Sequence, residues 1–271
     1  MTNTPDTAGV ERTLDIAGSS IWTELLGRHD APNRPTIIAF HGSGGGSESW
    51  ADLVRRTSAF ARTLAYDRAG QGRSTKAEAG STPLSASDEL SAVLKELSVK
   101  PPFILVAHSY GGCIAREFLQ KRGRDVAGMV LAETGQETLS EFEEEQYRKQ
   151  ALGKRPLSVI RANSLLTKER EFEQALSEGK VQKPEPMRTM LKQWDVEDER
   201  LKKEQLRLSS NTRYVHVPDC GHNIVRERPD VVADEVRWVL EQWEQLAAMD
   251  NIEKSKTTRI LAWLKKVVKL T

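Results

Sequence analysis

Cysteine is scarce in this chain, and neither long apolar runs nor an excess of one charge occur. Two cysteines, Cys113 and Cys220, cannot form a disulfide framework, which indicates a reducing, cytoplasmic setting. No run approaches the roughly 18 apolar residues that a membrane span needs. Residues 1–10 are polar and lack the apolar stretch of a secretory signal. Lysine and arginine total 40 against 39 acidic residues, so the net charge of +1 gives no general attraction to nucleic acid.

The 271 residues do contain an alternation of short apolar runs with helical patterns. This alternation is typical of an α/β fold with a mostly parallel central sheet and helices on both faces. An N-terminal hairpin is expected over residues 12–27, turning at Gly18 and Ser19. The other predicted strands are Thr36–Phe40, Thr63–Tyr66, Phe103–Ala107, Gly128–Ala132, Leu157–Ile160 and Tyr214–Val217.

Apolar residues at helical spacing predict helices at Leu84–Leu97, Tyr110–Lys121 and Pro229–Trp243. Residues 135–210 break the alternation, because they are rich in Glu, Lys and Gln with scattered apolar positions. We interpret them as a mainly helical cap, in which Trp194 would contact the substrate; plain surface helices are the alternative. The core would then comprise residues 1–134 and 211–249, with a strand near 156–161 belonging to its sheet.

The C-terminal segment, residues 250–271, has six basic and two acidic residues and hence a net charge of +4. Ile260, Leu264 and Val268 recur on one helical face, which predicts a basic amphipathic helix. Two interpretations stay open. The helix either makes a weak contact with a membrane surface, or packs on the domain or on a second copy in a homodimer.

The strongest motif is a serine between a strand and a helix, in residues 107–112 (AHSYGG). Small residues two positions to either side of Ser109 permit a sharp turn, which exposes its oxygen at the helix N-terminus. A buried serine in an ordinary loop is the alternative, and the strand and helix around it favour a nucleophile. His108 is expected to pack beneath this turn, beside the substrate.

A glycine-rich loop, residues 41–46 (HGSGGG), follows an earlier strand. Gly42 and Gly44 would let the backbone approach a substrate carbonyl. The amides of Ser43 and Tyr110 would then form an oxyanion hole. A phosphate-binding loop is the alternative, but the Gly-Lys-Ser/Thr ending of such loops is missing.

Five histidines are present, and His222 is the best candidate for a general base. It lies in a glycine-containing loop (DCGHN) after the last strand, later in the chain than Ser109. A surface histidine is the alternative. The histidines and cysteines show no zinc-ligand spacing, so neither a metal nor a cofactor is expected.

Together with residues 66–74 (YDRAGQGRS), these motifs resemble the α/β-hydrolase family over roughly residues 12–246. The resemblance implies an eight-stranded sheet of that type, a cap, and a Ser–acid–His triad. In that family the Asp-Arg turn is usually structural, so Asp67 and Arg68 receive no catalytic role.

The acid departs from the usual family pattern. The strand Leu157–Ile160 is followed by Arg161, Ala162 and Asn163, without a carboxylate. The preceding strand runs directly into Glu133, which some members of the family use, and we predict Glu133 as the acid. The second choice is Glu137, and the third is Asp195 or Asp198. A pocket-lining or helix-capping role for Glu133 is the alternative.

These residues predict a serine hydrolase that cleaves a carboxylic ester or lactone of a small, largely apolar substrate. Ser109 would be the nucleophile, His222 the base and Glu133 the acid. The same residues could serve thioester cleavage, acyl transfer or carbon–carbon bond hydrolysis. A non-catalytic small-molecule receptor is the alternative from another class, because the acid is missing at its usual place. No nucleic-acid partner is expected.

Overall fold

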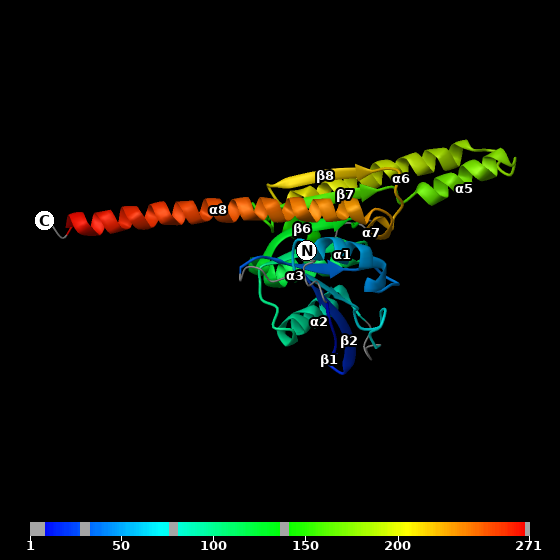
Figure 1. Cartoon of the computed structure of the whole chain (residues 1–271). Helices are drawn as coiled ribbons and strands as arrows, with labels where there is room; N and C mark the ends of the chain where they lie inside the picture. Colours follow the sequence, from blue (N-terminus) through cyan, green and yellow to red (C-terminus); the bar gives the residue numbers. More distant parts are fainter. Residues whose placement is uncertain (1–8, 28–32, 76–80, 136–140, 269–271) are drawn as a thin grey trace, which may run out of the picture.

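The computed structural model describes residues 9–27, 33–75, 81–135 and 141–268. Its centre is an eight-stranded sheet with the order β1-β2-β4-β3-β5-β6-β7-β8 (Figure 1). The hairpin β1–β2 joins β4 in antiparallel pairing, and all other pairs are parallel, which confirms the predicted fold class. The strands are β1 Val10–Ile16, β2 Ser19–Leu26, β3 Thr36–Phe40, β4 Thr63–Tyr66, β5 Phe103–His108, β6 Val126–Ala132, β7 Leu157–Ala162 and β8 Thr212–Val217.

Helices cover both faces of the sheet. One apolar core joins the sheet to α2, α3 and α4, and a second joins the opposite face to α1, α7 and α8. The helices are α1 Ala51–Ser58, α2 Pro83–Glu96, α3 Gly111–Arg122, α4 Glu141–Arg148, α5 Leu166–Ser177, α6 Glu185–Glu204, α7 Ile224–Glu227 and α8 Pro229–Val268. Short 3-10 turns are η1 Ser47–Trp50, η2 Gly123–Asp125 and η3 Gln205–Leu208.

The sequence pattern located the strands and helices α2 and α3 to within a few residues, whereas α1 was not predicted. Strand β3 coincides with its predicted range, and every residue of β3, β5 and β6 is buried, as runs without polar alternation require. The N-terminal hairpin turns one residue earlier than predicted, at Ala17 and Gly18. Both have positive φ, of 51° and 79°, as a two-residue hairpin turn of the right twist demands.

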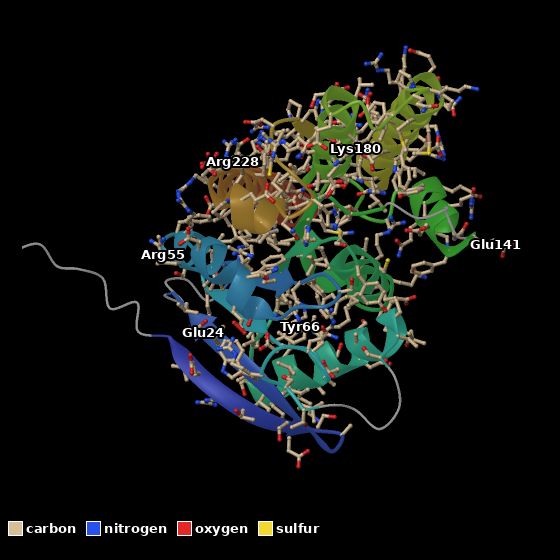
Figure 2. The ribbon with its side chains drawn as sticks, turned by 90° about the vertical axis from the view of Figure 1, so that its right-hand side faces the viewer. Glu24, Arg55, Tyr66, Glu141, Lys180 and Arg228 are labelled. Carbon is tan, nitrogen blue, oxygen red and sulfur yellow. The ribbon has the colours of Figure 1, made fainter. Side chains whose placement is uncertain are left out.

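The chain between β6 and β8 is mainly helical, and its longest helices extend beyond the sheet. Helices α5 and α6 form a hairpin that projects sideways beyond β8 (Figure 1). Figure 2 views the molecule from that side, with Lys180 near the end of the hairpin and Glu24 of β2 at the other end of the view. The hairpin has a small apolar cluster of its own, formed by Leu165, Phe172 and Leu191.

Helix α8 is longer than the predicted helix Pro229–Trp243, because it continues without a break to Val268. Figure 1 shows its C-terminal half projecting away from the sheet. The predicted basic helix at residues 250–271 is therefore the continuation of α8, apart from residues 269–271, which lie outside the described ranges. None of the helices described is both long and apolar enough to cross a bilayer.

Candidate active site

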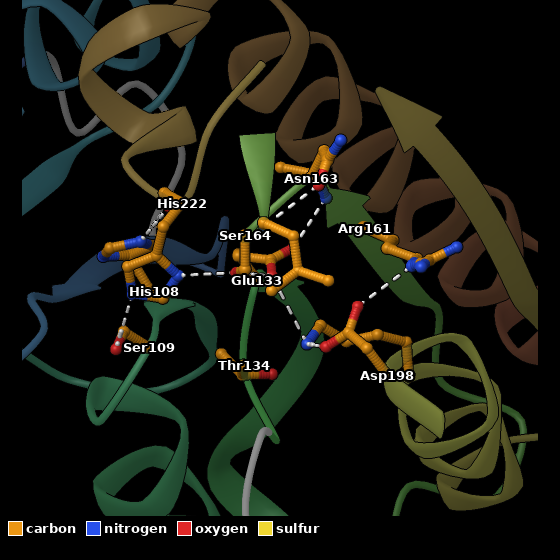
Figure 3. Close-up of polar contacts among 12 residues, drawn as sticks. His108, Ser109, Glu133, Thr134, Arg161, Asn163, Ser164, Asp198 and His222 are labelled. Carbon is orange, nitrogen blue, oxygen red and sulfur yellow. Dashed lines mark hydrogen bonds and ion pairs between the residues drawn. The ribbon is translucent and has the colours of Figure 1, made fainter. Parts of the chain in front are cut away.

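Ser109 occupies a sharp turn between β5 and α3. Its φ of +51° is a conformation that serine adopts only when the surrounding structure imposes it. The Ser109 Oγ atom lies 3.1 Å from Nε2 of His222 (Figure 3). The topology explains this position, because the carboxyl ends of β3 and β5 meet where the sheet order reverses, which is where ligands bind in open α/β sheets.

Two glycines allow α3 to begin against the sheet. A Cβ atom on Gly111 would lie 2.1 Å from the carbonyl oxygen of Phe40, and one on Gly112 would lie 2.7 Å from Cβ of Thr134. The contact at Gly111 cannot be relieved by a side-chain rotation, because the atom it meets belongs to the backbone of Phe40. The turn therefore requires glycine at position 111.

Replacing Gly111 by alanine should destabilise the protein by about 3 kcal/mol, because the added methyl group forces β3 and α3 apart. Urea unfolding followed by circular dichroism measures this loss. Gly123, at the other end of α3, is the matched control, since a Cβ atom there meets nothing within 4 Å. Equal unfolding midpoints for Gly111→Ala and Gly123→Ala would contradict the prediction.

His222 lies in the loop between β8 and α7. The ring of His108 packs at a centroid distance of 4.9 Å, and its Nε2–H donates to the His222 carbonyl over 2.7 Å. Burial lowers the pKa of His222 below its usual 6.5; the charge of Glu133 acts in the opposite direction, and that of Lys202 adds to the lowering. At neutral pH the ring is therefore largely neutral, as a general base must be.

Two other histidines near the site, His41 and His108, have structural roles. Burial is the main cause that lowers the pKa of His41 and of His108 to about 4, so both rings are neutral. Arg68 donates to the carbonyl groups of His41 and Gly42 over 2.5 and 2.7 Å, and thereby holds the end of β3. Asp67 accepts from the Ser47 amide over 2.6 Å. These contacts agree with the structural role predicted for the Asp-Arg turn.

Glu133 follows β6 directly and is fully buried. Its φ is +52°, so it shares with Ser109 a strained backbone that turns its side chain toward the site. One carboxylate oxygen accepts from the Ala162 amide over 2.6 Å, and the other accepts from the Ser164 hydroxyl over 2.5 Å. That hydroxyl also lies 3.2 Å from Nδ1 of His222 (Figure 3).

The other candidates for the acid lie elsewhere. The side chain of Asp195 is 54% exposed and pairs with Arg161. Asp198 is buried and contacts Arg161 over 3.0 Å and Lys202 over 2.7 Å. Its charge is therefore paired with these two basic side chains, and not with His222. Glu137 lies outside the described residues.

Two polar residues in this cluster were not predicted from the sequence. Lys202 of α6 is fully buried, with Nζ 3.4 Å from Glu133 and 2.7 Å from Asp198. Ser164 stands two residues after the end of β7, directly after Asn163. The position of Ser164 near a strand end could have indicated a site residue. For Lys202 the sequence gives no indication of burial, because it belongs to a highly charged helix.

Beside Ser109 and His222 lies a cavity of about 570 Å³. The two residues predicted to supply oxyanion-hole amides, Ser43 and Tyr110, line it together with Glu133. The remaining lining residues are Pro83, Gly112, Cys113, Arg116, Glu117, Leu131, Thr134, Gly135, Phe142, Glu143, Gln205 and His222, along with Ser109 itself.

Four residues predicted to contact substrate are not among those lining this cavity. Trp194 on α6 is 49% exposed, and Nζ of Lys168 lies 4.7 Å from the centre of its ring. It does not reach the cavity, because the α5–α6 hairpin projects away from it. His108 is buried beneath the turn, as its packing role requires. Gly42 packs against the Cβ atom of Ser109, and Gly44 adopts a φ of +74°. Of the segment 135–210, only Gly135, α4 and η3 reach the cavity among the described residues.

Within the ranges that the structure describes, histidine, cysteine and acidic side chains form no group of three that could hold a metal ion. Ser109, His222 and Glu133 all line the cavity. A hydrogen bond joins Ser109 to His222, and Ser164 links His222 to Glu133. This arrangement can remove a proton from Ser109 and return it to another oxygen.

Comparison with known proteins places this geometry in a family. The model of the alpha/beta hydrolase family matches residues 37–235. The uncharacterized protein YqjL of Bacillus subtilis (strain 168) is 28% identical over 238 residues, covering 83% of this chain and 90% of that protein. The probable transporter efuK of Hormonema carpetanum is 24% identical; the match covers 89% of this chain but only 44% of that protein, so this chain spans less than half its length.

Among solved structures, the enol-lactonase from Burkholderia xenovorans LB400 has a TM-score of 0.61 with this chain. It is 15% identical, and the match covers 85% of this chain and 100% of the lactonase. At that identity the likeness concerns the fold alone. The family model covers well over half of the sequence, and the chain therefore belongs to the alpha/beta hydrolase family.

Proposed function

We propose that this protein is a serine hydrolase that cleaves a carboxylic ester or lactone of a small substrate through an acyl-enzyme. The observation that carries the proposal is the 3.1 Å contact between Ser109 Oγ and His222 Nε2 at the wall of a cavity. That distance lies within reach for proton transfer from a nucleophile to its base. Glu133, joined to the other side of the imidazole through Ser164, supplies the acid.

In the first half of the reaction, Ser109 Oγ attacks the carbonyl carbon and His222 Nε2 takes its proton. The amides of Ser43 and Tyr110 would hold the oxyanion. His222 then gives the proton to the leaving oxygen, and the carbon–oxygen bond breaks. In the second half, water attacks the acyl carbon and gives a proton to His222. The bond from that carbon to Ser109 Oγ then breaks, His222 returns the proton to Oγ, and the acid is released.

The cavity wall limits the substrate class. Pro83, Leu131 and Phe142 offer apolar surface, which suits a short acyl chain. Arg116 and Glu143, 3.6 Å apart, place an ion pair at the same wall. A small ester or lactone with an apolar acyl part and a polar group elsewhere fits this lining.

Labelling with a fluorophosphonate tests the proposal, because the reagent reacts with an activated serine and marks it. Peptide mapping should find the label on Ser109 alone. A panel of p-nitrophenyl esters, thioesters and lactones, each tested as a competitor of labelling and as a substrate, would then rank the acyl bond. A folded protein that stays unlabelled at Ser109 would overturn the proposal, and preferred thioester turnover would correct its substrate class.

The pH dependence follows from the lowered pKa of His222. His222 accepts the Ser109 proton only when neutral, so activity falls as pH drops through its pKa. Because burial lowers that pKa, the midpoint of the acid limb of kcat/KM should lie below pH 6.5. Measuring kcat/KM for p-nitrophenyl butyrate between pH 4.5 and 8 checks this. An acid limb centred above pH 6.5 would contradict it.

A further inference from the structure

A hydroxyl group stands between the proposed acid and the proposed base. Ser164 Oγ lies 2.5 Å from Oε1 of Glu133 and 3.2 Å from Nδ1 of His222. Figure 3 shows Ser164 and Glu133 together on the side of His222 that faces away from Ser109. The polar contacts thus form a chain of four residues rather than three.

Charged side chains surround Glu133 on the side away from His222. Lys202, without solvent exposure, lies 3.4 Å from the Glu133 carboxylate and is held in turn by Asp198. Asp198 also pairs with the buried Arg161 over 3.0 Å. Arg161 also contacts Asp195 and lies 3.8 Å from Glu199. The Ala162 amide donates to one oxygen of Glu133, and the ammonium group of Lys202 lies beside the other, so both carboxylate oxygens face donors.

An ionised carboxylate accepts hydrogen bonds and donates none. The single hydroxyl proton of Ser164 must therefore point to Glu133, which leaves an Oγ lone pair for His222. Nδ1 of His222 then carries the proton that it donates to Ser164. Nε2 is left without a proton, so that it accepts from the Ser109 hydroxyl. This arrangement makes His222 a base toward Ser109.

We propose that Ser164 is a positioning residue for the reaction: its hydroxyl transmits the hydrogen bond from His222 to Glu133 and fixes the histidine tautomer. This inference rests on the proposed function, because it concerns the same site. No covalent change occurs at Ser164. When Nε2 takes the Ser109 proton, Ser164 accepts a stronger hydrogen bond from the imidazolium and keeps its own proton on the side of Glu133.

The place of Ser164 in the fold supports this role. It follows β7, whereas Glu133 follows the neighbouring β6, and the Glu133 amide bonds to the Ile160 carbonyl over 2.8 Å. The carboxyl end of β7 carries Arg161, Ala162 and Asn163 and no carboxylate. The Ser164 hydroxyl near that strand end therefore links His222 to the Glu133 carboxylate, which lies after β6.

Valine and threonine at position 164 give the sharpest test, because they have the same shape and differ in the hydroxyl. With p-nitrophenyl butyrate, we expect Ser164→Val to have a kcat/KM about 10- to 100-fold below that of Ser164→Thr, as for a lost hydrogen bond to a charged group. Ser164→Ala, which is smaller, should show the same loss. Ser177→Ala, an exposed serine of α5, is the matched control and should equal the wild type.

The acid limb of kcat/KM separates positioning from packing. The imidazolium of His222 loses an acceptor in Ser164→Val, so its pKa should fall and the limb should move about one pH unit lower. The other titratable groups that influence His222 are unchanged in both variants: Glu133 after β6, Lys202 and Asp198 on α6, Glu227 on α7 and His108 on β5. A packing defect alone would lower kcat/KM without moving the limb.

The outcomes distinguish the two proposals. If fluorophosphonate fails to label Ser109 in the wild type, the proposed function is wrong. If Ser109 is labelled but Ser164→Val and Ser164→Thr have equal kcat/KM and equal acid limbs, the role of Ser164 is wrong. Circular dichroism verifies folding, and if Ser164→Val does not fold, the comparison of Ser164→Ala with Ser164→Thr decides in the same way.

Discussion

Replacement of Ser109 by alanine is expected to lower kcat/KM for p-nitrophenyl butyrate by about 10⁵- to 10⁶-fold. The hydroxyl 3.1 Å from His222 Nε2 is the group that would form the acyl bond, and alanine offers no atom in its place. Residual turnover would come from the oxyanion-hole amides and substrate binding alone. Steady-state rates measure the effect. Fluorophosphonate titration excludes contamination by active enzyme.

This variant should fold as the wild type does. Alanine adopts the φ of +51° at position 109 with a strain similar to that of serine, and the packing of Gly111 against Phe40 is unchanged. Urea midpoints should therefore agree within experimental error. A folded Ser109→Ala protein that retains more than about a hundredth of the wild-type kcat/KM would refute the nucleophile assignment.

The parts of the fold that sequence predicted well are those encoded by local pattern. Fully apolar runs identified the buried strands, and β3 lies where its pattern places it. The serine between small residues at a strand-to-helix junction and the histidine after the last strand are local patterns too. Their meeting at 3.1 Å follows from the parallel topology, which brings the carboxyl ends of strands to one edge.

The parts that sequence missed depend on tertiary packing. Lys202 lies among many charged residues of α6, and nothing in that pattern distinguishes it from solvent-exposed Lys203. Its burial arises because α6 packs with Asp198 and Lys202 toward β6 and β7. Likewise, scattered apolar positions predicted that residues 135–210 are mainly helical but not the direction of the helices. Trp194 was therefore expected at the cavity, and it is not among the residues that line it.

Glu133→Gln should lower kcat/KM by about 10³-fold or more, close to the effect of disabling the acid of a catalytic triad. The Ala162 amide donates to Oε2 of Glu133, so the glutamine oxygen will take that position. Its NH₂ group will then take the position of Oε1, which faces both Ser164 and Lys202. Ser164 must then accept a hydrogen bond from that NH₂ group and donate its own proton to Nδ1 of His222. The imidazole would carry its proton on Nε2, where it cannot act as a base.

Asp195→Asn is the matched control, because it makes the same carboxylate-to-amide change at a side chain that contacts Arg161 and is half exposed. Its kcat/KM should stay within about twofold of the wild type, as for a surface ion pair. ¹⁵N NMR of labelled histidine should show the His222 proton on Nδ1 in the wild type and on Nε2 in Glu133→Gln. Near-normal turnover of Glu133→Gln together with a large loss in Asp195→Asn would move the acid from β6 to α6, and with it the hydrogen-bond chain through Ser164.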